Sequence, residues 1–128
     1  MIIDSSALIS ILLEEPGHES LLEKAGHAEV VFVGAPTALE TAMVLSSRLR
    51  RDVRPILSSF LRGMNVEVID FTEAHYEAAI SAFLRFGKGR HPAALNFGGC
   101  ISYALATVSG LPLLYSGTDF SRTDVQSA

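Results

Sequence analysis

The chain has 128 residues, the length of one ordinary domain, which excludes a multidomain machine and predicts a single domain over residues 1–128. Apolar residues make up 48% of the sequence, so global disorder is excluded. The 14 acidic and 10 basic residues leave a net charge of −4, which excludes nucleic-acid binding through bulk positive charge. Any contact with RNA or DNA would need a local basic patch or a bound metal ion.

Nothing in the sequence predicts membrane insertion or export. No segment has the roughly 18 consecutive apolar residues of a membrane helix, and Asp4 stands where a signal peptide would be apolar. The single cysteine, Cys100, has no intrachain disulfide partner, which suits a reducing compartment. We therefore expect a cytoplasmic protein without a membrane partner.

Four short apolar runs predict β-strands, near residues 2–3, 30–33, 66–69 and 113–115, and a fifth short strand could lie at 123–125. The runs are continuous rather than alternating, which is typical of parallel strands covered on both faces. Helical spacing fills the gaps between them. This spacing predicts a first helix that starts at Ser5 or Ser6. It predicts five further helices, at residues 19–25, 36–49, 52–61, 72–86 and 98–109.

Two of these helices carry apolar stripes that we expect to face the core. One contains Leu39 and Met43, in a helix with Ala35 as its cap and Pro36 at its first position. The other contains Tyr76, Ile80, Phe83 and Leu84. The order of elements predicts an α/β fold, a three-layer α/β/α sandwich around a mostly parallel sheet of four to five strands. In such sheets a functional site lies beyond the carboxyl ends of the strands.

Two aspartates directly follow predicted strands. Asp4 comes after the first strand, where it either caps the next helix or contributes to a site, and Asp119 comes after the last, where a simple Asx turn is the alternative. Glu40 lies inside an apolar helix, too far from the start to be a capping residue, and its partner is either an arginine or a metal ion. Three such carboxylates at one rim of the predicted sheet indicate Mg²⁺, or Mn²⁺, as a cofactor. The ion would activate a water molecule for attack on a phosphodiester.

Seven stretches of the sequence match one family: IIDSSAL at 2–8, EEPGH at 14–18, LETA at 39–42, GKGRHPA at 87–93, LNFG at 95–98, SYALA at 102–106 and PLLY at 112–115. The chain resembles PIN-domain ribonucleases, the VapC-type toxins of bacterial toxin–antitoxin pairs. The resemblance implies a PIN-like fold and a Mg²⁺-dependent endoribonuclease that is silenced by a cognate VapB-like antitoxin and forms a homodimer. It also implies that Asp4, Glu40 and Asp119 are catalytic, metal-binding acids and that Ser6 supports Asp4.

The sequence departs from the family pattern at the metal site. Family members read LNFGDC, with the Asp as a principal metal ligand, whereas this chain has Gly99 at that position. The family's KGDDF is here Ser116 to Phe120, which loses a carboxylate and a lysine. Either Gly99 was engineered or selected to disarm a toxic enzyme, or this is a naturally degenerate copy. We expect an impaired endoribonuclease; the alternative is a catalytically inactive PIN protein that retains antitoxin or RNA binding.

Two groups of basic residues could contact nucleic acid. Lys88, Arg90 and His91 lie in a polar loop and could bind the RNA backbone beside the metal site, with a solvated loop as the alternative. Arg48 and three further arginines, at positions 50, 51 and 54, crowd the end of a predicted helix. The helix dipole explains that second cluster without RNA.

Overall fold

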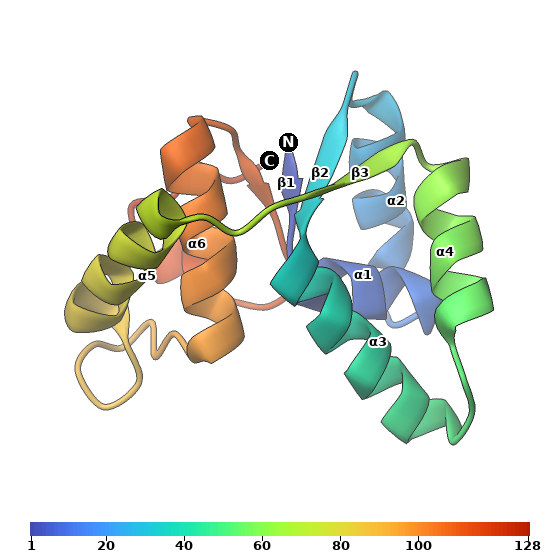
Figure 1. Ribbon diagram of the computed structural model, residues 1–128, viewed down its shortest axis with the longest axis horizontal. Coiled ribbons are helices and arrows are strands. Elements are labelled where there is room, and N and C mark those ends of the chain that lie inside the picture. Colours follow the sequence, from blue (N-terminus) through green and yellow to red (C-terminus); the bar gives the residue numbers. More distant parts are fainter.

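The computed structural model describes residues 1–128 and has a four-stranded sheet with helices on both faces. The strands lie in the order β3-β2-β1-β4 and are all parallel (Figure 1). The expected three-layer α/β/α sandwich is confirmed. In chain order the elements are β1 (Ile2–Ile3), α1 (Ser5–Leu12), α2 (His18–His27), β2 (Val31–Gly34), α3 (Ala35–Leu49), α4 (Arg54–Gly63), β3 (Val66–Ile69), α5 (Glu73–Phe86), α6 (Phe97–Ser109), β4 (Leu113–Leu114) and the 3₁₀ turn η1 (Phe120–Arg122).

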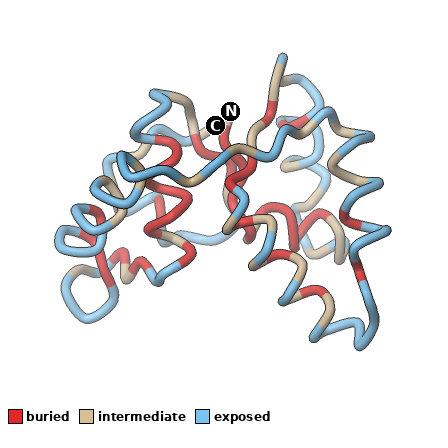
Figure 2. Tube along the Cα trace, viewed as in Figure 1, coloured by how far each residue is buried: buried red, intermediate tan, exposed pale blue.

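Each face of the sheet has its own apolar core. Ile2 and Leu113 point to the face covered by α5 and α6, whereas Ile3 and Leu114 point to the face covered by α1 and α2 (Figure 1). Successive residues of a strand face opposite ways, so continuous apolar runs are buried on both sides. Figure 2 shows this burial concentrated along the central strands. The interpretation of these runs is therefore correct for β1 and β4.

Strand β3 is the exception. It lies at the edge of the sheet, and Glu67 and Val68 are exposed. The expectation that this run is covered on both faces was wrong, because the helices leave Glu67 and Val68 uncovered, whereas β4 at the opposite edge is buried on both faces. No strand forms at residues 123–125 either. The chain instead returns to the other edge further on, where Ser127 forms an isolated parallel bridge with Leu113.

Helix boundaries differ slightly from the predictions because local capping decides them. Helix α3 begins at Ala35 with Gly34 as its N-cap, so Pro36 does not occupy the first position and Ala35 is not the cap. Helix α6 begins at Phe97, because the side chain of Asn96 accepts a hydrogen bond from the first turn. No helix here combines the length and the apolarity that crossing a bilayer requires.

Both predicted apolar stripes face away from the core. On α3, the buried residues are Thr37, Thr41 and Leu45, whereas Leu39 and Met43 are exposed. Thr41 is tolerated inside because its hydroxyl donates to the carbonyl of Thr37 at 2.8 Å. Hydrophobicity alone therefore selects the wrong face of this helix.

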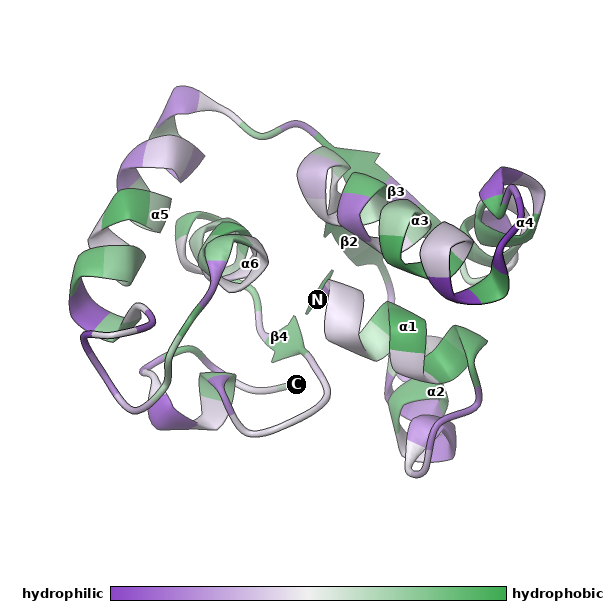
Figure 3. Cartoon of the chain, turned by 90° about the horizontal axis from the view of Figure 1, so that it is seen from below, coloured by the Kyte–Doolittle hydropathy of each residue, from purple (hydrophilic) through white to green (hydrophobic).

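On α5, the helix packs through its small and C-terminal residues, with Ala82 and Phe86 buried. The predicted stripe is exposed instead, and it comprises Tyr76, Ile80, Phe83 and Leu84. Helix α6 is the opposite case, because eight of its 13 residues are buried. Figure 3 shows hydrophobic residues around much of α6, which lies between α5 and the strands.

The C-terminal segment is attached to α5 and α6 by Asp124. Its carboxylate accepts hydrogen bonds from the Tyr103 hydroxyl at 2.5 Å and from Arg85 at 2.9 Å. The Tyr103 hydrogen bond, with the nearby guanidinium, lowers the pKa of Asp124. Asp124 is thus structural, and Cys100 on the same helix as Tyr103 is buried, which raises the pKa of its thiol.

Ser10 in α1 holds the one buried side-chain polar atom that has no hydrogen-bond partner. An unpaired buried hydroxyl is destabilising, and alanine is the better helix former. We expect Ser10→Ala to raise the free energy of unfolding by about 1–2 kcal/mol. Urea unfolding measures this, with Ser58→Ala on the exposed side of α4 as the control for helix propensity alone. An equal gain in both variants would contradict the prediction.

Candidate functional site

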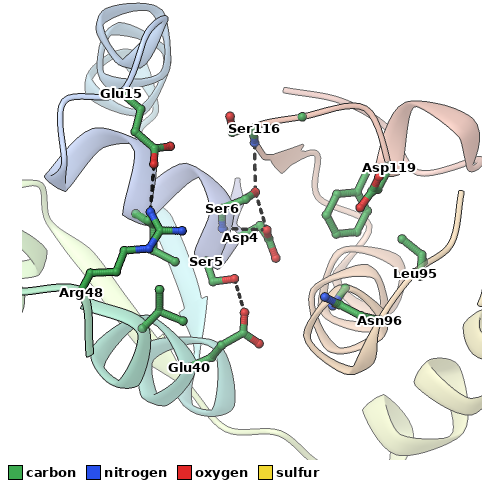
Figure 4. A pocket seen from close by; sticks show the side chains of 15 residues that line it. Asp4, Ser5, Ser6, Glu15, Glu40, Arg48, Leu95, Asn96, Ser116 and Asp119 are labelled. Carbon is green, nitrogen blue, oxygen red and sulfur yellow. Dashed lines mark hydrogen bonds and ion pairs between the residues drawn. The ribbon is translucent and has the colours of Figure 1, made fainter. Parts of the chain in front are cut away.

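An acidic pocket of about 360 Å³ opens beyond the carboxyl end of the sheet (Figure 4). In the sheet, β1 has β2 as its neighbour on one side and β4 on the other. The connections that follow β1 and precede β4 therefore diverge at the carboxyl end of β1. Figure 3, seen from the side toward which β1 runs, has α1 and α3 on one side and α6 on the other. The polar and charged residues that line the pocket are Asp4, Ser5, Ser6, Glu15, Glu40, Arg48, Asn96, Ser116 and Asp119.

Asp4 is the most buried acid of this pocket, with 4% of its surface exposed. It is the N-cap of α1, and its Oδ2 accepts hydrogen bonds from the Ser6 amide at 2.9 Å and the Ser6 hydroxyl at 2.6 Å. Its Oδ1 accepts from the Ser102 hydroxyl at 2.6 Å. Asp4 therefore both caps the helix and lines the pocket. A carboxylate has about four lone-pair sites, so one remains free, on Oδ1.

Two serines hold Asp4 from different parts of the chain. Ser6 also accepts a hydrogen bond from the Ser116 amide at 3.0 Å, which connects α1 to the loop after β4. Ser102 on α6 is fully buried, and its hydroxyl lies 3.5 Å from the hydroxyl of Thr37 on α3. The sequence interpretation identified Ser6 but missed Ser102. The available signals were a serine next to Ile101 in the middle of α6 and the family stretch SYALA, which begins at Ser102.

Glu40 is half-buried on α3 and has neither an arginine nor a second acid as its hydrogen-bond partner. Its Oε1 accepts from the Ser5 hydroxyl at 2.5 Å. The same carboxylate lies against the first turn of α6, where a Cβ at Gly98 would overlap it. Gly98 is thus sterically required if Glu40 is to keep this position.

Asp119 lines the opposite wall of the pocket and is exposed just before η1 (Figure 4). The three predicted acids thus share one pocket, with Asp4 between Glu40 and Asp119. However, no three Asp, Glu, His or Cys side chains lie close enough together to hold one metal ion. The three acids thus lie at one rim, as expected, but they do not form a preassembled three-carboxylate metal site. An oxygen-only donor set still suits Mg²⁺, which is commonly bound through one or two carboxylates plus water and substrate phosphates.

Comparison with known proteins agrees with this geometry. The model of the PIN domain matches residues 1–126. Ribonuclease VapC of Mycolicibacterium smegmatis is 42% identical over 125 residues, which cover 98% of this chain and 97% of that protein. Ribonuclease VapC36 of Mycobacterium tuberculosis is 40% identical over 127 residues, which cover 98% of this chain and 91% of VapC36. The chain belongs to the PIN-domain family, among the VapC ribonucleases. The resemblance seen in the sequence is confirmed.

Solved structures share the fold of this PIN domain. The Mycobacterium tuberculosis toxin VapC20, described as cleaving the sarcin-ricin loop, superposes with a TM-score of 0.77 at 17% identity, covering 99% of this chain and 97% of its own. A toxin–antitoxin complex from Klebsiella pneumoniae gives a TM-score of 0.70 at 17% identity, covering 96% of this chain and 92% of that chain. At this identity the likeness establishes the architecture.

Gly99 follows Gly98 in the first turn of α6 but differs from it sterically. Its amide donates to the Asn96 side chain at 2.8 Å, and its backbone is helical. A Cβ at Gly99 would meet Asn96 Oδ1 at 3.3 Å and Leu95 Cδ2 at 3.4 Å, so a small adjustment admits a side chain. The backbone of this PIN domain therefore does not demand glycine at position 99, and the residue lines the acidic pocket.

The loop between α5 and α6 does not place its basic residues in the pocket. Lys88, Arg90 and His91 are all absent from the pocket lining. The His91 ring accepts a hydrogen bond from the Ala93 amide at 3.0 Å and packs edge-on against Phe86, which is a structural role. The Arg90 guanidinium lies over an aromatic ring of α5. These residues were expected beside the metal site, but the loop turns back onto α5.

Arg48 is the site residue that the sequence interpretation assigned to a helix end. It follows Glu40 and Val44 at intervals of four residues, so all three share the face of α3 that lines the pocket. Its Nη1 donates to Glu15 Oε1 at 3.1 Å (Figure 4). The spacing from Glu40 was the available signal.

Ser102→Ala removes a hydrogen bond from a buried carboxylate. Because hydrogen bonds to charged groups contribute about 1.5–3 kcal/mol, we expect the free energy of unfolding to fall by about this amount. Urea unfolding measures it. The matched control is Ser109→Ala, whose hydroxyl on the same helix donates to backbone carbonyls. If both variants lose the same free energy of unfolding, the hydrogen bond from Ser102 to Asp4 contributes no more than an ordinary serine hydrogen bond to the backbone.

Proposed function

We propose that this PIN domain is the metal-dependent endoribonuclease toxin of a VapBC-type toxin–antitoxin module, with its chemistry impaired at position 99. The observation that carries the proposal is the acidic pocket, in which Asp4, Glu40 and Asp119 face one another across the carboxyl end of the sheet. Family membership supports the reaction class, since the curated relatives are named ribonucleases.

In this proposal Asp4, Glu40 and Asp119 are the acids that hold Mg²⁺, or Mn²⁺ in its place. Such an ion lowers the pKa of a bound water and stabilises negative charge on a phosphodiester. The protein's part is to position its carboxylates. Ser6 and Ser102 fix the orientation of Asp4, and Ser5 fixes that of Glu40.

Gly99 weakens this site because it contributes no ligand at a position that lines the pocket. Loss of an anionic ligand lowers both metal affinity and activation of water. We therefore propose that the chain as it stands binds Mg²⁺ weakly and cleaves little RNA. The steric room beside Gly99 supports a carboxylate being accepted there.

Gly99→Asp should restore cleavage, because it returns an acid to a pocket that keeps Asp4, Glu40 and Asp119. We expect Mg²⁺-dependent cleavage of total RNA to rise by at least about 100-fold, measured on gels with EDTA as the blank. Gly99→Ala is the control, since it changes helix propensity without adding an acid.

A second variant tests whether the restored activity depends on the predicted acids. Asp4→Asn in the Gly99→Asp background should remove cleavage again. If the unsubstituted chain and the Gly99→Asp variant cleave equally, the role given to this position is refuted.

The second candidate function is a catalytically inactive PIN protein that retains antitoxin or RNA binding, and Gly99 is the observation that favours it. Lys88 and Arg90 are exposed and are proposed to contact the RNA backbone outside the pocket, whereas His91 supports their loop. A chain that still binds RNA and a VapB-like antitoxin, but is not revived by Gly99→Asp, would support this alternative.

We also propose that the protein is a homodimer. An apolar groove of about 600 Å³ lies between α5 and α6, and Phe97, which forms part of its wall, is 83% exposed. A protruding ring and a groove on one face can fit each other in a two-fold pair. The exposed stripe of α5 lines this groove, including Tyr76, Ile80 and Phe83.

Phe97→Ser tests the dimer. Because Phe97 is exposed, the substitution should leave the far-ultraviolet circular dichroism spectrum unchanged while shifting the mass in light scattering from dimer to monomer. Leu22→Ser is the control, because it removes an exposed apolar side chain from α2, outside the groove. A protein that is monomeric before substitution would overturn the proposal.

A further inference from the structure

The carboxylates of the acidic pocket would repel the phosphates of an RNA strand that enters it. Four carboxylates line it, those of Asp4, Glu15, Glu40 and Asp119, and the only basic side chain in its wall is Arg48. Each phosphate of an incoming strand carries a negative charge, so the pocket repels the strand wherever a cation does not intervene. Gly99 reduces this repulsion but adds no attraction. A fixed positive charge in the wall is therefore the natural contact for a phosphate.

Arg48 is placed to supply that charge. It lies two turns after Glu40 on the pocket-facing side of α3, so it is beside the predicted acids without touching Glu40. Its guanidinium makes a single side-chain hydrogen bond, to Glu15. The two side chains are 54% and 42% exposed, so water screens the pair and a stronger anion can replace it.

We propose that Arg48 binds an RNA phosphate that flanks the scissile bond, and that Glu15 holds the guanidinium in the free protein and releases it when RNA enters. The inference rests on the proposed function, because it requires the pocket to receive RNA. Arginine suits the task, since its planar fork can bind two phosphate oxygens at once. Lys88 and Arg90 cannot replace it, because neither lines the pocket.

The first test measures binding without chemistry. A fluorescein-labelled single-stranded RNA of mixed sequence is titrated with the 128-residue chain in EDTA, and anisotropy is followed over a series of salt concentrations. Arg48→Ala should weaken binding about three- to tenfold and lower the slope of log affinity against log salt by about 0.7, the contribution of one phosphate contact. Arg51→Ala is the matched control, because Arg51 is exposed nearby and does not line the acidic pocket.

Conservative replacement separates charge from geometry. Arg48→Lys should recover the salt slope but only part of the affinity, because an ammonium lacks the two-pronged contact. A purely structural Arg48 would instead change the thermal midpoint and leave the salt slope as it was.

The second test concerns Glu15. Glu15→Gln should free Arg48 and tighten RNA binding about two- to threefold. Glu14→Gln, on the adjacent exposed acid, controls for the lost charge. In an Arg48→Ala background the gain from Glu15→Gln should shrink to the part that comes from lower repulsion of the strand, since there is no guanidinium left to release.

The outcomes distinguish failure of the Arg48 proposal from failure of the proposed function. If RNA binds but Arg48→Ala behaves like Arg51→Ala, or if Glu15→Gln gives the same gain with and without Arg48, the inference is overturned and the proposed function stands. If neither the chain nor its Gly99→Asp variant binds RNA, the proposed function falls and the inference with it.

Discussion

The hydrogen bonds to the buried Asp4 carboxylate are the interaction on which the site depends. A charge removed from water must be compensated by donors, and here they come from Ser6 at the start of α1 and Ser102 in the middle of α6. Ser6 in turn holds the loop after β4. One carboxylate thus joins both helical layers at the end of the central strand. Its position follows from the folding of segments almost 100 residues apart in the chain.

The topology of the sheet explains why a pocket exists beside Asp4. The connections from β1 to β2 and from β3 to β4 leave on different sides, so no element covers the carboxyl ends of the central strands. Helix α3 brings Glu40 to one wall and the loop after β4 brings Asp119 to the other. The two glycines at the start of α6 then act differently. Gly98 makes room for Glu40, whereas Gly99 leaves a space that a side chain could occupy.

Electrostatics limits what such a pocket can do alone. Its carboxylates suit a hard cation, yet they are not gathered into a preformed three-ligand cluster, and they oppose the approach of a polyanion. A divalent ion and Arg48 would each reduce the repulsion between the pocket carboxylates and the polyanion. An overall charge of −4 does not by itself argue against the proposed RNA substrate, because such a contact would depend on local charges rather than on the sum.

The sequence by itself determined the layered parallel fold and the common location of Asp4, Glu40 and Asp119. Continuous apolar runs predict buried parallel strands, and parallel strands end at the same edge, so residues that follow them meet there. It also singled out Gly99, because a comparison with a family motif needs no coordinates.

Only the tertiary structure decided which face each helix presents and which partner each polar group finds. The most apolar stripes of α3 and α5 lie outside, and a threonine is buried because its hydroxyl is satisfied within the helix. Ser102 became a site residue for the same reason, whereas Arg48 could have been found from its helical spacing to Glu40. A side chain's role depends on what is packed opposite it, and that arises from contacts between distant segments, which helical spacing and composition do not encode.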